Sequence, residues 1–296
     1  MGTSRAIEMR RRLRERMARS ADPILLPGAA NALAARVVEE CGFEAVYVTG
    51  AGIANTFLGV PDIGLVTLDE LVAHTEAIAD AVSLPLVVDA DTGFGGPINV
   101  ARTVKVLQRA GAAAVQLEDQ TFPKRCGHFA GKEVIPPAEM VAKIAAALDT
   151  CGGDDLLVVA RTDARATSGL AEAIDRAGRY REAGADVIFV EAPESEAELA
   201  EVGRAVPGPK LVNMVEGGRT PILPAAELAR LGFSVILYAN SALRGAVAGM
   251  RTVLTELRDE GTTLGAADAM IGWDERQRLV RKPLFDELER RYQVKG

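Results

Sequence analysis

The loop Lys124-Arg125-Cys126-Gly127-His128 places a thiol, two cations and an imidazole within five consecutive residues. Neighbouring Lys and Arg side chains lower the pKa of a thiol, and a histidine can relay its proton. We therefore predict that Cys126 acts as a general acid or base near neutral pH; the alternative is a surface loop with an incidental cysteine. Cys41 and Cys151 each precede a glycine, which favours structural or incidental positions, and His74 lies in a predicted helix with a packing or surface role.

Carboxylates form the second chemical group. Asp89 and Asp91 follow one predicted strand, and Glu118 ends the next. Residues two apart on an extended strand point the same way, so we expect both aspartates to face one site. Carboxylates gathered at one rim repel each other unless a cation neutralises them, and oxygen ligands without a His or Cys cluster favour Mg²⁺, with Mn²⁺ as an alternative. The competing interpretation is that these acids cap helices or pair with arginines.

Two glycine-rich turns, Gly50-Ala51-Gly52 and Gly93-Phe94-Gly95, follow the second and third predicted strands. In those places their backbone N–H groups can point at a substrate carboxylate. Glycine at a strand end often serves only a turn, so neither motif is specific by itself. The stretch that begins at Tyr47 is not a dinucleotide-binding fingerprint, because the third glycine is missing.

The elements that must position these residues predict one closed barrel. Short β-rich apolar runs alternate with amphipathic helical stretches, and glycine ends four of these just before the next strand, as in repeating βα units. Eight such runs in 296 residues favour a (β/α)₈ TIM-like barrel with its active site at the carboxyl ends of the strands. The predicted strands are Pro23–Pro27, Ala45–Thr49, Leu84–Asp89, Ala113–Glu118, Leu156–Arg161, Val187–Glu191, Lys210–Asn213 and Val235–Tyr238.

The two ends of the chain lie outside this repeat. We predict a barrel with an N-terminal helix over residues 1–240 and a C-terminal helical arm over 241–296, which packs either on its own barrel or on a neighbouring subunit. The Arg-rich segment 5–19 is predicted to be a surface helix rather than a targeting peptide, because Glu8 and Glu15 interrupt it and it runs directly into the first strand.

The composition excludes several classes of partner. A net charge of −7 and a pI near 5.1 argue against nucleic acid and anionic membranes. No apolar run approaches the roughly 20 residues that span a bilayer. Three sparse cysteines without a secretory leader indicate reduced thiols, and therefore a cytoplasmic location.

The segments 89–93, 118–120, 124–128 and 161–164 together resemble the isocitrate lyase/phosphoenolpyruvate mutase superfamily, and the resemblance runs from about residue 22 to 260. The motif at 124–128 is similar to that of the lyase branch, which includes 2-methylisocitrate lyase and the 2-alkylmalate (dimethylmalate) lyases. The resemblance implies a Mg²⁺-dependent barrel enzyme whose C-terminal helix is exchanged between paired subunits. It also implies a homotetramer, a dimer of helix-swapped dimers, and a mobile gate at the Cys126 loop.

The same resemblance implies a role for each matched position. Asp89 would hold Mg²⁺ with Asp91 and Glu118 assisting, and Cys126 would be the catalytic acid in a motif that also supplies Lys124 and His128. Arg161, a substrate-binding arginine, and Tyr47 complete the catalytic group. The positions matched to substrate binding are Thr49, Gly50, Ala51, Asp62, Gly127, Glu191, Asn213 and Glu216. The family often has Ser-Gly-Gly where this chain has Thr49-Gly50-Ala51, which leaves the detail there open.

The implied reaction is carbon–carbon cleavage of a small di- or tricarboxylate to a 2-oxo acid such as pyruvate plus a carboxylate. Mg²⁺ would stabilise the developing oxygen charge, Arg161 would hold a carboxylate in a bidentate pair, and a thiol would protonate the carbanion. The base that removes the hydroxyl proton is left open between Tyr47, Glu191 and a metal-bound hydroxide.

The substrate also stays open. Val190 precedes Glu191 where 2-methylisocitrate lyases usually carry proline, the segment 213–218 looks more like alkylmalate lyases and phosphonate-type relatives, and the segment 238–240 lacks a common Tyr-Pro pattern. Candidates are 2-methylisocitrate, a 2-alkylmalate, or oxaloacetate hydrolysed to oxalate and acetate. A carboxyphosphoenolpyruvate mutase, which forms a P–C bond, and a non-catalytic barrel are the competing classes.

Overall fold

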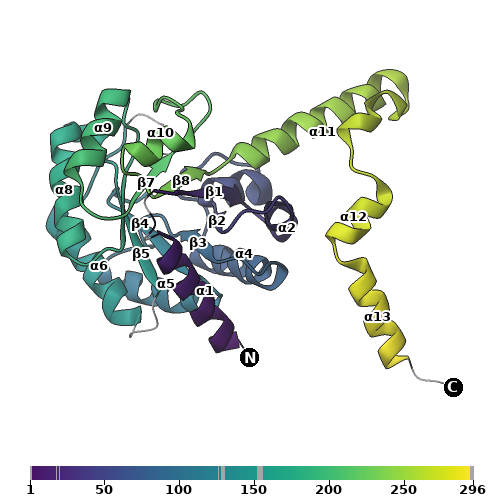
Figure 1. Cartoon of the computed structure of the whole chain (residues 1–296), viewed down its shortest axis with the longest axis horizontal. Coiled ribbons are helices and arrows are strands. Elements are labelled where there is room, and N and C mark those ends of the chain that lie inside the picture. The colour runs from purple at the N-terminus through teal and green to yellow at the C-terminus, as the bar shows by residue number, and fades with distance from the viewer. Residues whose placement is uncertain are drawn as a thin grey trace. The chain divides into compact units, whose positions relative to one another are not determined.

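The computed structural model describes residues 2–17, 19, 21–125, 127, 131–151 and 156–293, with side chains from residue 6 onward. Eight parallel strands close into a barrel in chain order, with β8 paired to β1, and helices surround it (Figure 1). The predicted TIM-like barrel is therefore confirmed. The strands are β1 (Ile24–Ala29), β2 (Val46–Val48), β3 (Leu86–Asp89), β4 (Ala114–Glu118), β5 (Leu157–Thr162), β6 (Val187–Val190), β7 (Lys210–Asn213) and β8 (Val235–Tyr238).

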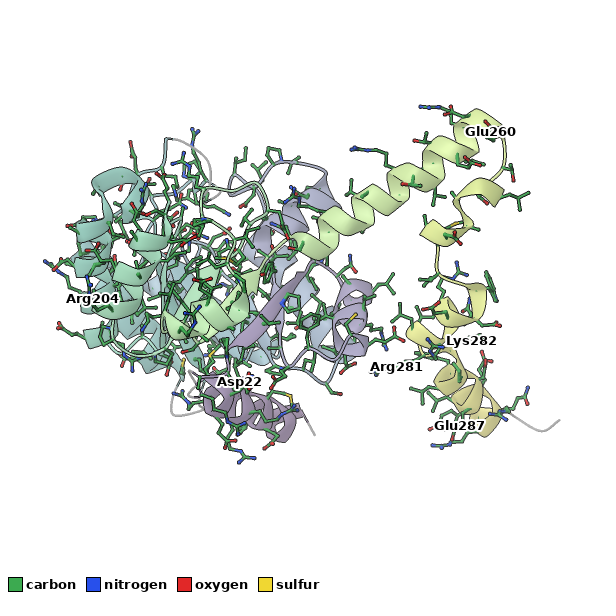
Figure 2. The ribbon with its side chains drawn as sticks, turned by 45° about the horizontal axis from the view of Figure 1, so that its top comes forward. Asp22, Arg204, Glu260, Arg281, Lys282 and Glu287 are labelled. Atoms are coloured by element: carbon green, nitrogen blue, oxygen red, sulfur yellow. The ribbon has the colours of Figure 1, made fainter. Side chains whose placement is uncertain are left out.

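The helices follow the alternation that the sequence predicts. Those of the barrel unit are α1 (Gly2–Met17), α2 (Ala32–Glu40), α3 (Gly50–Ile53), η1 (Ala54–Leu58, a π-helix), α4 (Leu68–Ala81), α5 (Pro97–Arg109), α6 (Pro137–Cys151), α7 (Ala164–Ser168), α8 (Leu170–Glu182), α9 (Glu196–Ala205) and α10 (Ala225–Arg230). Figure 2 shows side chains along these outer helices, with Arg204 on α9 pointing away from the barrel.

Local sequence signals explain where these helices begin and end. Thr67 and Glu70 form a reciprocal capping box at the start of α4, and the Ser195 hydroxyl accepts from the Glu198 backbone N–H at the start of α9. The second residue after each of the helices α2, α5, α8 and α10 is a glycine in the left-handed region. These are Gly42, Gly111, Gly184 and Gly232, the four glycines that end the helices of the βα repeat.

The apolar core has two layers. One lies between the strands and the surrounding helices, and the other fills the barrel interior with side chains such as Tyr47, Val87 and Phe189. Parallel pairing fixes which strand ends are neighbours: Asp89 pairs with Gln116, and Glu118 pairs with Arg161. The barrel therefore brings charged residues from successive strands together at one rim.

The N-terminal helix is more deeply buried than we predicted. Leu13 and Met17 of α1 are only 1% and 2% exposed, and they pack in the same interior cluster as Ala45 and Ala113, which lie at the N-terminal ends of β2 and β4. The prediction of a surface helix is therefore wrong on this face. Leu13 and Met17, four residues apart, form a short apolar stripe in a helix that is otherwise rich in arginine. This stripe packs against the amino-terminal end of the barrel.

The chain divides into two compact units, Met1–Ser241 and Ala242–Gly296. Four helices run from the junction onward: α11 (Ser241–Glu260), η2 (Leu264–Ala269), α12 (Trp273–Leu279) and α13 (Lys282–Tyr292), with Glu260, Lys282 and Glu287 marked in Figure 2. Val247, Met250, Leu254 and Leu257 recur at helical spacing along α11, and all four are exposed. None of the helices in the described part of the chain combines the length and apolar character that a bilayer span requires.

Candidate active site

Charged side chains are buried where the strands β3 to β6 end. Asp89 ends β3, Glu118 ends β4, Arg161 lies next to the end of β5, and Glu191 directly follows β6. Each is less than a tenth exposed. Burying ionised groups costs free energy unless they are paired, so this concentration at the rim indicates a functional site.

Asp89 and Asp91 converge as predicted, but by a different backbone path. The extended strand ends at Asp89, and Asp91 has a φ of +48°, in the left-handed region. The premise that both residues lie on an extended strand is therefore wrong. Their carboxylates nevertheless meet near Gly50, where a Cβ would lie 3.5 Å from Asp89 Oδ2 and 3.6 Å from Asp91 Oδ1. A residue without a side chain thus keeps the space beside both carboxylates open.

Side chains from the neighbouring strands β2 and β4 hold the Asp89 carboxylate by hydrogen bonds. Its Oδ1 accepts hydrogen bonds from Gln116 Nε2 at 3.2 Å and from the Asp91 backbone N–H at 3.3 Å. The hydroxyl of Tyr47 also bonds to Asp89, and burial, together with the charge of Asp89, raises the pKa of Tyr47 well above its usual value. Gln116 was not among the predicted site residues. It lies two residues before Glu118 on the same face of β4, so the strand period was the signal that could have found it.

Lys124 enters this acidic group from the loop after β4. Its ammonium pairs with Asp62 and lies 2.9 Å from Asp91 Oδ1, and only 4% of the side chain is exposed. Burial opposes the charge, but Asp91, Glu118 and Asp62 outweigh it and raise the pKa of Lys124 well above its usual value. Asp62 and Lys124, both predicted site residues, are therefore brought to the carboxylates at the end of β3 and just after it.

Glu118 and Arg161 form the second half of the site. Arg161 Nε lies 3.4 Å from Glu118 Oε2, Arg161 Nη1 lies 3.9 Å from Glu191 Oε2, and the guanidinium covers the Phe189 ring at 5.2 Å. Burial raises the pKa of Glu118 well above its usual value, and the Arg161 charge opposes this rise. An arginine held among carboxylates at the rim can bind a substrate carboxylate in a bidentate pair.

Two buried residues beside Arg161 were missed. Asp163 accepts from Arg161 and from Lys132, and Lys132 also donates to the backbone oxygen of Gly127. Asp163 belongs to the run that follows β5, so its position was visible although its role was not. Lys132 carried no signal, because only the folded loop brings it back to β5.

The remaining predicted residues have varied surroundings. The Thr49 hydroxyl caps α3 by accepting from Gly52 N–H at 3.1 Å, and Ala51 lies half-buried in that helix. Asn213 ends β7, and Glu216 accepts from the Ser241 hydroxyl at 2.6 Å. Two predicted residues, Cys126 and His128, lie outside the described residues. His74, expected to have a packing role, bonds through Nδ1 with the Ala30 carbonyl and contacts the Phe57 ring edge to face.

The carboxylates fit a magnesium ion of the usual kind. Glu118 Oε1 is a buried carboxylate oxygen with no hydrogen-bond partner among the described residues, and one oxygen each of Asp89 and Asp91 lies beside Gly50. Within the same part of the chain, no three His, Cys, Asp or Glu side chains form a complete ligand set. Mg²⁺ commonly takes only one or two carboxylates and completes its shell with water and substrate oxygens, so this arrangement suits it.

A surface groove lies at the other end of the barrel, where the strands begin. This groove of about 930 Å³ runs between α1, α4 and α5 and is lined by residues such as Ala79, Leu84 and Arg109. None of the residues predicted for the site lines this groove. The chemistry therefore belongs to the other end, where active sites of this fold lie.

This barrel with a buried acidic rim belongs to a known class of enzyme folds, and comparison identifies the class. Residues 13–258 match the family described as phosphoenolpyruvate phosphomutase. The chain is 45% identical to 2,3-dimethylmalate lyase of Eubacterium barkeri, over 91% of this chain and 93% of that protein. It therefore belongs to this family, as its motifs predicted.

Relatives named for different activities are similarly close. The chain is 45% identical to 2-methylisocitrate lyase of Aeropyrum pernix, over 84% of this chain and 80% of that protein. It is 44% identical to the chloroplastic carboxyvinyl-carboxyphosphonate phosphorylmutase of Arabidopsis thaliana, over 91% and 80%. Identity alone therefore does not separate lyases from this phosphorylmutase.

Solved structures agree with the fold. Oxaloacetate acetylhydrolase bound to 3,3-difluorooxalacetate gives a TM-score of 0.91 at 35% identity, covering 98% of this chain and 99% of that one. The 2,3-dimethylmalate lyase, described as a member of the PEP mutase/isocitrate lyase superfamily, gives 0.90 at 38% identity, covering 96% and 95%. Phosphonopyruvate hydrolase in complex with oxalate and Mg²⁺ gives 0.86 at 31%, covering 96% and 99%.

Proposed function

We propose that this protein is a Mg²⁺-dependent carbon–carbon lyase that cleaves 2-methylisocitrate or a related 2-alkylmalate to a 2-oxo acid such as pyruvate plus a carboxylate. The observation that carries the proposal is the buried rim where Asp89 and Asp91 converge beside Gly50 and Glu118 lies next to Arg161. Carboxylates for a divalent ion beside a cation for a carboxylate suit a substrate that is itself a hydroxy di- or tricarboxylate. The named lyases among the relatives support the same class.

The metal would be held by Asp89, with Asp91 and Glu118 assisting directly or through water. When bound, Mg²⁺ stabilises negative charge that develops on substrate oxygens during cleavage, and Mn²⁺ is the alternative ion. Phosphonopyruvate hydrolase, a structural relative, has been solved with oxalate and Mg²⁺, which supports magnesium here. Lys124 supplies a fixed positive charge to the same carboxylates.

The chain's own side chains would then orient the substrate. Arg161 would bind one substrate carboxylate, and the backbone N–H groups of Gly50 and Ala51, in the first turn of α3, would hold a second. Asp62, Gly127, Glu191, Asn213 and Glu216 complete the proposed substrate-binding group, and Thr49 contributes through the cap of α3. Loss of the proton on the tertiary hydroxyl lets the C2–C3 bond break, and the electron pair passes to the carbon beside the other carboxylate.

The proton that quenches this carbon is proposed to come from Cys126, with His128 and Lys124 in the same motif as supporting groups. Tyr47 is a poor base for the hydroxyl proton, because its raised pKa and its hydrogen bond to Asp89 keep it protonated. We therefore assign Tyr47 the task of orienting Asp89. Glu191 and a base supplied with the metal remain the candidates for that step.

A substrate panel tests the proposal. Purified protein with Mg²⁺ is given 2-methylisocitrate, 2,3-dimethylmalate, citramalate and oxaloacetate, and the products are identified by NMR. We expect pyruvate from an alkylmalate or from methylisocitrate. The second candidate is a phosphonomutase, favoured by the 44% identity to the phosphorylmutase, and it would produce a ³¹P signal for a new P–C bond instead. Oxalate plus acetate from oxaloacetate would indicate a hydrolase.

We also propose that the chain acts in the cytoplasm as a homotetramer, a dimer of helix-swapped dimers. The cytoplasmic location rests on its sparse cysteines. The assembly rests on α11, whose exposed residues Val247, Met250, Leu254 and Leu257 form an apolar stripe of the kind that a partner subunit covers. Light scattering should give a tetramer mass for the wild type and a smaller mass for Leu254→Lys.

A further inference from the structure

Lys132 is a buried lysine outside the motifs that point to the site. Its side chain is 1% exposed. Its ammonium donates a 2.6 Å hydrogen bond to Asp163 Oδ1 and another of 2.6 Å to the backbone oxygen of Gly127. Because a buried ammonium needs such partners, these bonds fix where the side chain lies. Lys132 therefore ties the peptide at Gly127 to the end of β5.

Asp163 is shared between Lys132 and Arg161. Arg161 Nε donates to Asp163 Oδ2 at 2.8 Å, and Arg161 Nη2 donates to Oδ1 at 3.0 Å, a bidentate pair. Burial by itself raises the pKa of Asp163, but the charges of Arg161 and Lys132 outweigh it and lower the pKa to about 2. The Asp163 backbone N–H is in turn anchored on Asp119 at 2.9 Å. One ionised, immobile carboxylate thus orients both cations.

The peptide at Gly127 lies directly against the group proposed to bind substrate. A Cβ at this position would lie 2.6 Å from Arg161 Nη2 and would overlap Glu191 Oε1. A side chain at residue 127 therefore requires the Arg161 and Glu191 side chains, or the peptide itself, to shift. Any displacement of this peptide changes the space around the edge of the Arg161 guanidinium that faces Glu191, while Asp163 holds the other edge.

We propose that Lys132 is a positioning residue that, through Asp163 and the Gly127 backbone oxygen, fixes the geometry in which Arg161 receives a substrate carboxylate. Lys132 contacts none of the reacting atoms in this arrangement; it acts on Arg161 and on the Gly127 peptide at once. The inference rests on the proposed function, because that function makes Arg161 the carboxylate-binding group.

The test compares two buried lysines. Lys132→Met removes the ammonium at the rim, and we expect KM to rise and oxalate affinity in the presence of Mg²⁺ to fall, each by roughly 10- to 100-fold, as misplacement of a substrate clamp does. Lys210→Met is the matched control, because Lys210 is also buried and donates to two backbone oxygens, of Val206 and Gly208, near the start of β7. That variant should keep wild-type KM and oxalate affinity.

A double-mutant cycle separates positioning from general damage. Gly127→Ala disturbs the same contact between the Gly127 peptide and Arg161 that Lys132 holds, so the losses of oxalate affinity in Lys132→Met and Gly127→Ala should not multiply in the double variant. Losses that multiply would overturn the proposal, as would wild-type oxalate affinity in Lys132→Met.

Folding of each variant is checked by circular dichroism and thermal unfolding. Should Lys132→Met not fold, Lys132→Arg keeps the positive charge but not the geometry of the ammonium, and we expect it to fold with weakened oxalate binding; wild-type affinity there would overturn the proposal. A wild-type protein that bound oxalate but cleaved neither methylisocitrate nor an alkylmalate would contradict the proposed function. The oxalate affinities of the variants would still test the positioning role of Lys132 in that case. A wild-type protein that bound no oxalate would contradict both.

Discussion

At the carboxyl ends of the strands the barrel buries Asp89, Glu118 and Arg161, whereas at the amino ends it is filled by apolar side chains of α1, Leu13 and Met17. All five side chains are less than a tenth exposed, but burial has different effects at the two ends. Apolar burial stabilises the fold by about 25 cal/mol per Å² of surface removed from water, whereas buried charges stabilise it only as far as partners compensate desolvation. The comparison teaches that one end holds the barrel together and the other is kept, at a cost in stability, for chemistry.

The largest effect on activity should come from the thiol proposed as the acid. Cys126→Ser replaces a thiol with a hydroxyl whose pKa is far too high for proton transfer, so kcat should fall roughly 10²- to 10⁴-fold. Oxalate affinity in the presence of Mg²⁺ should be unchanged. Cys41→Ser, at an exposed cysteine, is the control and should retain full activity. Near-wild-type kcat in Cys126→Ser would remove the acid role.

The next effect concerns the metal. Asp89→Asn removes a charge from the proposed Mg²⁺ site and disturbs the hydrogen bonds from Gln116 and Tyr47, so Mg²⁺ affinity should fall roughly 100-fold and kcat/KM with it. Chelation with EDTA should abolish wild-type activity, and added Mg²⁺ should restore it. Asp80→Asn, at an exposed residue of α4, should titrate with Mg²⁺ like the wild type. Mg²⁺ binding in Asp89→Asn equal to wild type would place the metal elsewhere.

A smaller effect is the pH dependence of metal binding. Burial raises the pKa of Asp91 to about 7, the neighbouring carboxylates add to the rise, and Lys124 opposes it. A metal must therefore displace a proton below pH 7, and the affinity for Mg²⁺ should fall by up to about tenfold from pH 8 to pH 6. Calorimetric titration at both pH values measures this, and Asp91→Asn should flatten the dependence.

The same group gives a stability prediction of opposite sign. A carboxyl whose pKa is higher in the folded than in the unfolded protein stabilises the fold only while it is protonated, so this contribution is lost as pH rises through about 7. The Tm of the metal-free protein should therefore fall between pH 6 and pH 8, and less so in Asp91→Asn. A wild-type Mg²⁺ affinity that is equal at pH 6 and pH 8 would contradict both expectations.

The smallest effect on activity should come from the other end of the barrel. Leu13→Ala leaves a cavity beneath the strands and should lower the free energy of unfolding by about 2–5 kcal/mol. The kcat/KM at a temperature where the variant is folded should stay within about twofold of wild type, since the charged rim is untouched. Leu33→Ala, at a half-exposed leucine of α2, should change neither quantity much. A large loss of kcat/KM in folded Leu13→Ala would mean that the two ends are coupled.

The sequence could predict what depends on period and on chain order. The alternation of strands and helices, with glycine at four helix ends, was enough for the barrel, and the rim at β3 to β6 followed because parallel strands end on the same side. The family and the lyase class followed from the motif at 124–128, and the relatives bear them out.

The path of the irregular backbone could not be predicted from the sequence. No local sequence signal predicts that Asp91 adopts a positive φ, or that the loop brings Lys132 back to Asp163. The burial of α1 was hard to predict because arginines dominate its composition, and one of them, Arg10, is itself buried beside Leu13 and Met17. Roles for Cys126 and the other site residues stay predictions, since chemistry depends on a substrate that no residue pattern identifies.

The most direct test of the lyase proposal is product analysis in D₂O with Mg²⁺, using 2-methylisocitrate and 2,3-dimethylmalate. Cleavage of the C2–C3 bond yields pyruvate with succinate from the first and with propionate from the second, and protonation of the carbanion by an exchangeable acid places one deuterium beside the carboxylate of the second product. We predict Mg²⁺-dependent pyruvate from at least one substrate, with a singly deuterated partner product. Pyruvate from neither substrate, at any Mg²⁺ concentration, would contradict the account.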